Sequence, residues 1–143
     1  MTRAQAIAKN YEQARREYVR ERSAILNSTG SSLQGEASSR GQWSGNRTTE
    51  AKAAKLESLE RFQWVKEMHA VEHARDRIGA SLPDEMRRAL QAAIMLNCTS
   101  GRRYPFERLY VVGISRRTFY RFRQRFFDDI AAELSRTWQN EQY

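Results

Sequence analysis

Two histidines and a glutamate form a pattern that is typical of metal chemistry. His69, Glu72 and His73 match the H-x-x-E-H spacing, which places two imidazoles one helical turn apart with a carboxylate between them. A catalytic zinc needs a third protein ligand, and the chain has only 2 histidines. We therefore interpret these residues as polar positions on a helix, and we expect no metal and no other cofactor.

Arginines indicate a second kind of chemistry, the binding of nucleic acid. The chain has 25 basic and 17 acidic residues, a formal net charge of +8. Between Arg102 and Arg125 there are eight arginines and one acid, Glu107. A guanidinium group presents a planar fork of donors that suits phosphates and the guanine edge. A genome rich in arginine codons would explain how frequent arginine is, but not where it clusters. The clustering predicts a DNA-binding surface in the C-terminal third.

The residues after Ser115 divide between two faces of a predicted helix that runs from Arg116 to Leu134. Apolar side chains recur at spacings of three and four and should point into the core: Phe119, Phe122, Phe126, Ile130 and Leu134. The other face offers arginine for guanine and phosphate, glutamine for adenine, and tyrosine for phosphate or a thymine methyl group. The expected DNA-contacting residues are Arg102, Arg103, Ser115, Arg116, Arg117, Thr118, Tyr120, Arg121, Gln124 and Arg125.

The segment before this helix has the residues of a tight turn between two helices. A short helix is predicted from Pro105 to Val111, followed by Gly113, which tolerates the positive φ that such a turn needs. Ile114 can fill the angle between the helices, and Ser115 is a preferred N-cap residue. The pattern predicts a helix-turn-helix. A solvated charged face beside an ordinary turn would produce the same residues, and this alternative stays open.

Amphipathic periodicity predicts an all-α fold for the rest of the chain. The expected organisation is an N-terminal helix in residues 1–27, a flexible polar linker in 28–48, a long middle helix in 49–80 and a helix-turn-helix region in 81–143. In the last region, Gly79 should end the middle helix, Ser81 should cap the next helix with Pro83 in its first turn, and that helix should run from Asp84 to Leu96.

Several function classes lack their sequence signals. No apolar run approaches the length of a membrane span, and no signal core follows the first residues, so we expect a cytoplasmic protein of a bacterial host cell and no membrane partner. Cys98 is the single cysteine and is interpreted as a packing residue. Since no phosphate-binding loop and no nucleophile elbow occur, we expect no enzyme.

Three stretches together have a familiar pattern: Leu82 to Glu85 (LPDE), Val112 to Arg121 (VGISRRTFYR) and Ile130 to Leu134 (IAAEL). They resemble the fourth domain of bacterial sigma factors and, more closely, the RinA/ArpU group of phage regulators, which are sigma-like proteins that switch on late operons. The resemblance implies activation of late-gene promoters, with RNA polymerase as a partner. It places the groove contacts on Arg116, Arg117, Tyr120, Arg121 and Gln124. Residues 4–78 contain no matching short motif, so only the last third is specific.

Two other functions remain open at this point. A phage small-terminase-like packaging protein also joins a helix-turn-helix to oligomerising helices, and an interaction protein could present its basic surface to an acidic partner such as a polymerase subunit. The apolar stripe from Leu56 to Ile78 is long enough to serve as the seam of a homo-oligomer. The expected partners are therefore double-stranded DNA, RNA polymerase and a second copy of the chain.

Overall fold

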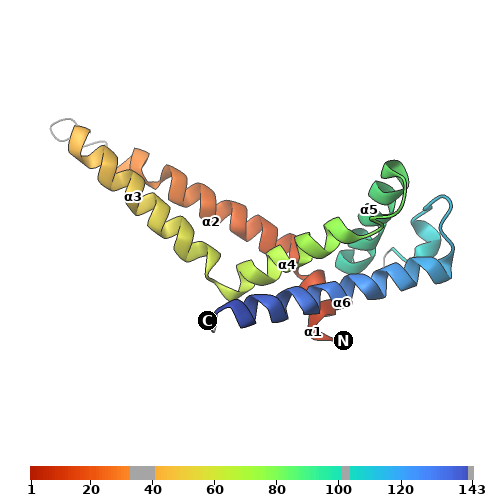
Figure 1. Cartoon of the computed structure of the whole chain (residues 1–143). Coiled ribbons are helices and arrows are strands. Elements are labelled where there is room, and N and C mark those ends of the chain that lie inside the picture. Colours follow the sequence, from red (N-terminus) through yellow and green to blue (C-terminus); the bar gives the residue numbers. More distant parts are fainter. Residues whose placement is uncertain (33–40, 101–103, 142–143) are drawn as a thin grey trace. The chain divides into compact units, whose positions relative to one another are not determined.

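The protein is all-helical, as the periodicity predicts. The computed structural model describes residues 1–32, 41–100 and 104–141, and within these ranges the backbone forms α-helices and one 3₁₀ helix but no strand (Figure 1). The chain divides into two compact units. One consists of Met1–Gln13 with Lys66–Tyr143, and the other consists of Ala14–Val65.

The N-terminal segment forms two helices where the sequence analysis predicted one. Helix α1 (Arg3–Lys9) begins with a capping box, in which Thr2 and Gln5 satisfy each other's backbone amides. It ends at Asn10, and α2 (Tyr11–Ser32) follows directly. Asparagine competes with helical hydrogen bonding and is common at helix ends, which accounts for the break that an unbroken apolar period had hidden.

The predicted long middle helix is also divided. Helix α3 (Gly41–Glu60) closes with bonds of the tighter i to i−3 type at Arg61 and Phe62, and α4 (Gln63–Arg77) begins immediately after. Phe62, which was expected in the apolar stripe, is 55% exposed at this break. No glycine or proline marks the position, so the sequence carries no ordinary signal for it.

The predicted linker is shorter than residues 28–48. The backbone is helical up to Ser32 and again from Gly41, where α3 begins, and 33–40 lie outside the described residues. Within the second unit, the Tyr18 hydroxyl of α2 donates a hydrogen bond to Glu60 at the end of α3. This bond and burial both raise the pKa of Tyr18. The polar composition therefore did not prevent helix formation at either end of the expected linker.

The turn before helix α5 (Asp84–Ser100) differs in detail from the prediction. Gly79 ends the preceding helix with φ +66°, as expected, but Ser81 lies inside the turn that the Leu82 amide closes on the Gly79 carbonyl. The Pro83 carbonyl accepts from the Arg87 amide, so proline occupies the cap position.

Helix α5 also runs one turn past the predicted end. The hydroxyls of Thr99 and Ser100 donate to helix carbonyls, and the buried Asn97 donates to the Tyr104 carbonyl at 2.8 Å. These polar side chains find partners in the backbone, so they continue the helix where we had expected them to break it.

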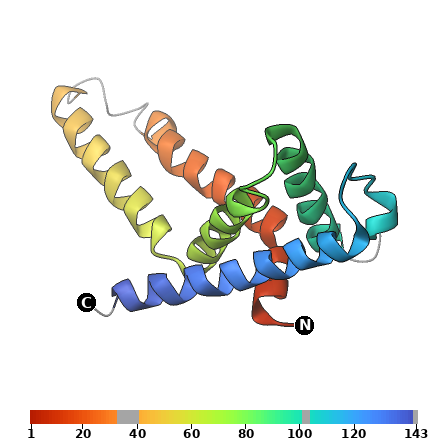
Figure 2. The same cartoon turned by 45° about the vertical axis from the view of Figure 1, so that its right-hand side comes forward.

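The first unit has one core, which α6 (Arg116–Glu141) crosses along its length. Helix α1 packs against both α5 and α6 (Figure 2). The largest fully buried side chains of this unit come from α4, α5 and α6: Met68, Val71, Leu90, Ile94, Phe119, Phe126 and Ile130. No helix in the described part of the chain combines the length and apolar character that crossing a membrane requires.

Candidate nucleic-acid interface

The start of α6 is fixed by a turn with unusual backbone geometry. Gly113 has φ +82°, as the turn prediction required, and the next residue, Ile114, is buried. The Ser115 hydroxyl accepts from the Thr118 amide at 3.2 Å and donates to the Thr118 hydroxyl at 2.9 Å. The predicted N-cap is therefore present.

The helix expected before this turn is much shorter than predicted. Only a 3₁₀ helix, η3 (Phe106–Arg108), forms in place of the predicted Pro105 to Val111 helix. Tyr110 has φ +50° and ends it, since a residue in this conformation cannot continue a right-handed helix. The first member of the predicted helix pair is thus a single turn.

Four of the expected contact residues share the solvent face of α6. Arg117, Arg121, Gln124 and Arg125 are all exposed, and Gln124 and Arg125 lie three and four residues after Arg121, which itself lies four after Arg117. Neither Arg117 nor Arg121 has an acidic partner among the described residues. Gln124 donates a hydrogen bond to the Asp128 carboxylate at 3.1 Å, so an acidic residue lies at the C-terminal edge of this face.

Arg116 and Tyr120 lie on the flank of the helix and already have partners. The Arg116 guanidinium forms an ion pair with Glu107 at 3.2 Å while remaining exposed. Two guanidinium groups lie near the Tyr120 ring: that of Arg116 is 5.5 Å from the ring centre and that of Arg123 is 5.8 Å from it. Contacts of this length stabilise a cation over an aromatic face. They hold the flank in a fixed arrangement.

The inner face of α6 agrees in part with the prediction. Phe119 and Phe126 are completely buried, and Ile130 is too. Phe122 and Leu134 were expected in the core but are only half-buried. The Arg125 guanidinium lies 6.0 Å from the Phe122 ring and shields it from solvent. Phe127, which was not expected inside, is 4% exposed.

Several residues in this region were missed or cannot be placed. Arg102 and Arg103 lie outside the described residues. Tyr110 and Val112, on either side of the turn, are each 86% exposed, although their apolar character had suggested no surface role. Arg123 was counted in the basic cluster without a position, yet its Nε atom is buried and has no hydrogen-bond partner within the described part of the chain.

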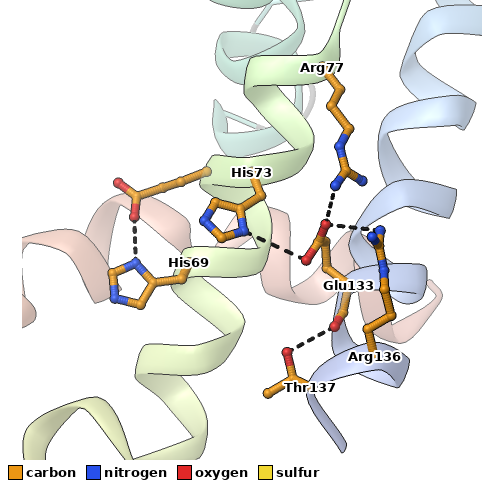
Figure 3. A network of polar contacts seen from close by, with 7 residues as sticks. His69, His73, Arg77, Glu133, Arg136 and Thr137 are labelled. Atoms are coloured by element: carbon orange, nitrogen blue, oxygen red, sulfur yellow. Dashed lines mark hydrogen bonds and ion pairs between the residues drawn. The ribbon is translucent and has the colours of Figure 1, made fainter. Parts of the chain in front are cut away.

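The histidine pattern lies on α4 and is occupied by contacts between helices (Figure 3). His69 Nδ1 lies 3.0 Å from Glu72, whose other oxygen accepts from the Tyr11 hydroxyl at 2.9 Å. His73 lies 3.6 Å from Glu133 of α6. Among the described residues, no three potential ligands gather into a metal site.

Glu133 is the centre of a polar network that joins α4 to α6. Its carboxylate, with 13% of the side chain exposed, forms ion pairs with Arg77 of α4 and with Arg136 one turn further along α6. Figure 3 shows both guanidinium groups and the His73 ring pointing toward this one carboxylate. Through Arg77 and His73, this carboxylate is a polar link between the two helices.

Comparison with other proteins gives no further guidance. No protein-family model, no curated protein and no solved structure matches this chain.

Proposed function

We propose that this chain binds double-stranded DNA in a sequence-specific manner, with the first half of α6 in the major groove. The observation that carries this proposal is that Arg117 and Arg121 are exposed and have no acidic partner among the described residues, while the phenylalanines on the opposite face of the same helix are buried. An ordinary solvated surface balances its arginines with nearby acids, whereas here Glu107 pairs with Arg116 alone.

The dimensions of α6 suit this role. A helix with its side chains is about as wide as the major groove of B-DNA. Arg117 and Arg121 would read base edges, and Gln124 would exchange its bond to Asp128 for one to adenine. The capped N-terminus and Arg116 would bind phosphates and set the register.

We further propose that binding activates transcription of phage late genes. This step rests on the resemblance to RinA/ArpU-like regulators, which implies RNA polymerase as the partner. It is separate from DNA binding, so each step has its own test.

Replacing Arg117 or Arg121 by alanine tests the groove assignment. The preferred site is first selected from a pool of random duplexes, and binding is then measured by fluorescence anisotropy. We expect each variant to bind this site roughly 5- to 150-fold more weakly, which corresponds to a loss of about 1 to 3 kcal/mol per base contact. The helical circular dichroism signal should stay unchanged, because both side chains are exposed.

Arg16→Ala is the matched control, since Arg16 is an exposed arginine of α2. It removes the same charge and should leave the affinity within about twofold, because Arg16 belongs to the compact unit that does not contain α6. Wild-type affinity in both Arg117→Ala and Arg121→Ala would exclude α6 as the recognition helix. Activation is tested by transcription from the selected site with purified polymerase, where an absent stimulation would refute that step while leaving the binding result intact.

A further inference from the structure

A pocket lies on the side of α6 that faces away from the proposed DNA surface. Its volume is about 670 Å³, and its walls come from α1, α5, α6 and the residue before η3. This volume falls within the range of small-molecule sites, which is about 300 to 1,000 Å³. Arg123 lines it and is two residues from Arg121, which corresponds to about 200° around the helix. Arg123 therefore lies on a different face of α6 from Arg121.

Arg123 is the unusual residue in this wall. Its guanidinium carbon lies 4.8 Å from the centre of the Phe127 ring, and its Nε atom is buried without a hydrogen-bond partner in the described residues. A buried donor left unpaired is destabilising, and more so when the group is charged. The Nε–H group of Arg123 therefore lacks a hydrogen-bond acceptor in the described part of the chain.

The chemistry of the lining indicates what that acceptor is. Lys9 supplies a second positive charge, and none of the described residues that line the pocket is acidic. Tyr120, Phe127 and Pro105 supply flat apolar surface beside the two cations. Cys98, also in the wall, is neutral at physiological pH, because burial raises the pKa of its thiol to about 11, while the charge of Arg123 and a side-chain hydrogen bond between Arg123 and the thiol act in the opposite direction.

We propose that this pocket binds a small organic anion in which a carboxylate or phosphate group is attached to an aromatic or aliphatic body. The anionic group pairs with Arg123 and Lys9, and the body lies against Tyr120, Phe127 and Pro105. Charge-assisted bonds to guanidinium and ammonium groups are the strong ones in such sites.

A ligand in the pocket can affect the proposed DNA-binding surface through the side chain of Tyr120. Tyr120 lines the pocket and also lies under the Arg116 guanidinium. A bound anion that draws Arg123 away from the Tyr120 ring changes the support of Arg116. This link rests on the proposed function, whereas binding of the anion does not, so the first test contains no DNA.

Titration calorimetry of the full chain with three matched probes tests the proposal. Phenyl phosphate and phenylacetate carry the anionic group, and phenylacetamide is the neutral counterpart of the second. We expect saturable binding of an anionic probe, and at least about tenfold weaker binding of the amide. Arg123→Gln and Lys9→Gln should each lower the affinity for the anionic probe at least about tenfold. Arg125→Gln, on the far face of the same helix, is the matched control and should bind it like the wild type.

Several results would overturn the proposal. These are equal binding of phenylacetate and phenylacetamide, no saturable binding of either anion at millimolar concentration, or an equal loss in the Arg125→Gln control. Lys9→Gln changes an exposed side chain and should fold normally. If Arg123→Gln loses its helical circular dichroism signal, the affinity of Lys9→Gln for the anionic probe decides whether the proposal holds. If the anions bind as expected but leave DNA affinity unchanged, the ligand site stands and its link to Arg116 is wrong.

Discussion

Single side chains of α6 show how closely folding and binding residues alternate. Phe119 and Phe126 are both 0% exposed, while Arg117 and Arg125 lie in solvent two positions or one position away. Neighbouring residues of a helix point about 100° apart, so a substitution affects either the core or the surface and seldom both. The two roles can therefore be tested separately.

Truncating a core phenylalanine should destabilise the fold. Phe126→Ala is expected to lower the free energy of unfolding by about 3 to 5 kcal/mol, since it empties a completely buried position. Phe122→Ala, at a half-buried position, is the control and should lose clearly less. Urea denaturation followed by circular dichroism measures both. Equal losses in the two variants would show that Phe122 belongs to the core after all.

The spacing of apolar residues predicted only part of this division. It identified Phe119, Phe126 and Ile130 correctly, because a stripe at intervals of three and four follows one side of a helix. It failed for Phe122 and Phe127, because α6 contacts different helices along its length and its buried stripe shifts around the axis. The cation that covers each of these rings, Arg125 or Arg123, comes from α6 itself, and no periodicity rule anticipates that pairing.

At the level of elements, the turn before α6 depends on a glycine. Gly113 has φ +82°, and a Cβ atom added there would lie 2.9 Å from the Met86 Cε atom of α5. We expect Gly113→Ala to lower the free energy of unfolding by about 1 to 2 kcal/mol, because side chains disfavour a left-handed backbone.

A double variant separates the two causes at Gly113. Met86→Ala removes the close contact but leaves the backbone angle unchanged, so most of the loss should persist when Gly113→Ala is introduced into that background. Thermal or urea unfolding of the four proteins gives the comparison. If Met86→Ala abolishes the loss, the contact and not the backbone conformation is responsible.

Glu133 of α6 forms an ion pair with Arg77 of α4, and Glu141 at the end of α6 forms another with Lys66. Glu133→Gln keeps the shape of the side chain but leaves Arg77 and Arg136 without their shared anion. We expect a loss of about 1 to 3 kcal/mol in unfolding free energy, as for a part-buried bond to a charged group. Glu57→Gln, which breaks an exposed pair between Glu57 of α3 and Arg61 just after it, should lose less than about 1 kcal/mol. Matching losses would refute the structural role of Glu133.

Helix existence could be predicted, but several helix ends could not. The break after Glu60 has no glycine or proline, and the extension of α5 past Leu96 depends on Asn97 bonding to Tyr104, a residue outside the helix. Both depend on partners that come close only in the folded chain. Gly79 and Gly113 were correctly placed at turns, because the backbone conformation there favours glycine wherever the rest of the chain lies.

At the scale of the whole molecule, which has a net charge of +8, the proposed DNA binding should depend on salt. The logarithm of the binding constant should fall linearly with the logarithm of salt concentration, with a slope near −0.9 for each phosphate neutralised. Arg116→Ala, at a proposed phosphate contact, should reduce this slope by about 1, and Arg16→Ala should leave it unchanged. Binding that hardly responds to salt would favour the alternative of a protein partner over DNA.

The unbroken course of α6 has a consequence for how that helix would meet its target. Arg117, near one end, and Glu133, in the second half, are roughly 24 Å apart at about 1.5 Å per residue, and no kink separates them. Glu133 is one of the points at which polar contacts hold this helix against α4. Glu133→Gln should therefore change the angle of the N-terminal half of α6 and weaken the binding of all duplexes by a similar factor. Arg121→Ala should instead change which duplex sequences are bound most tightly.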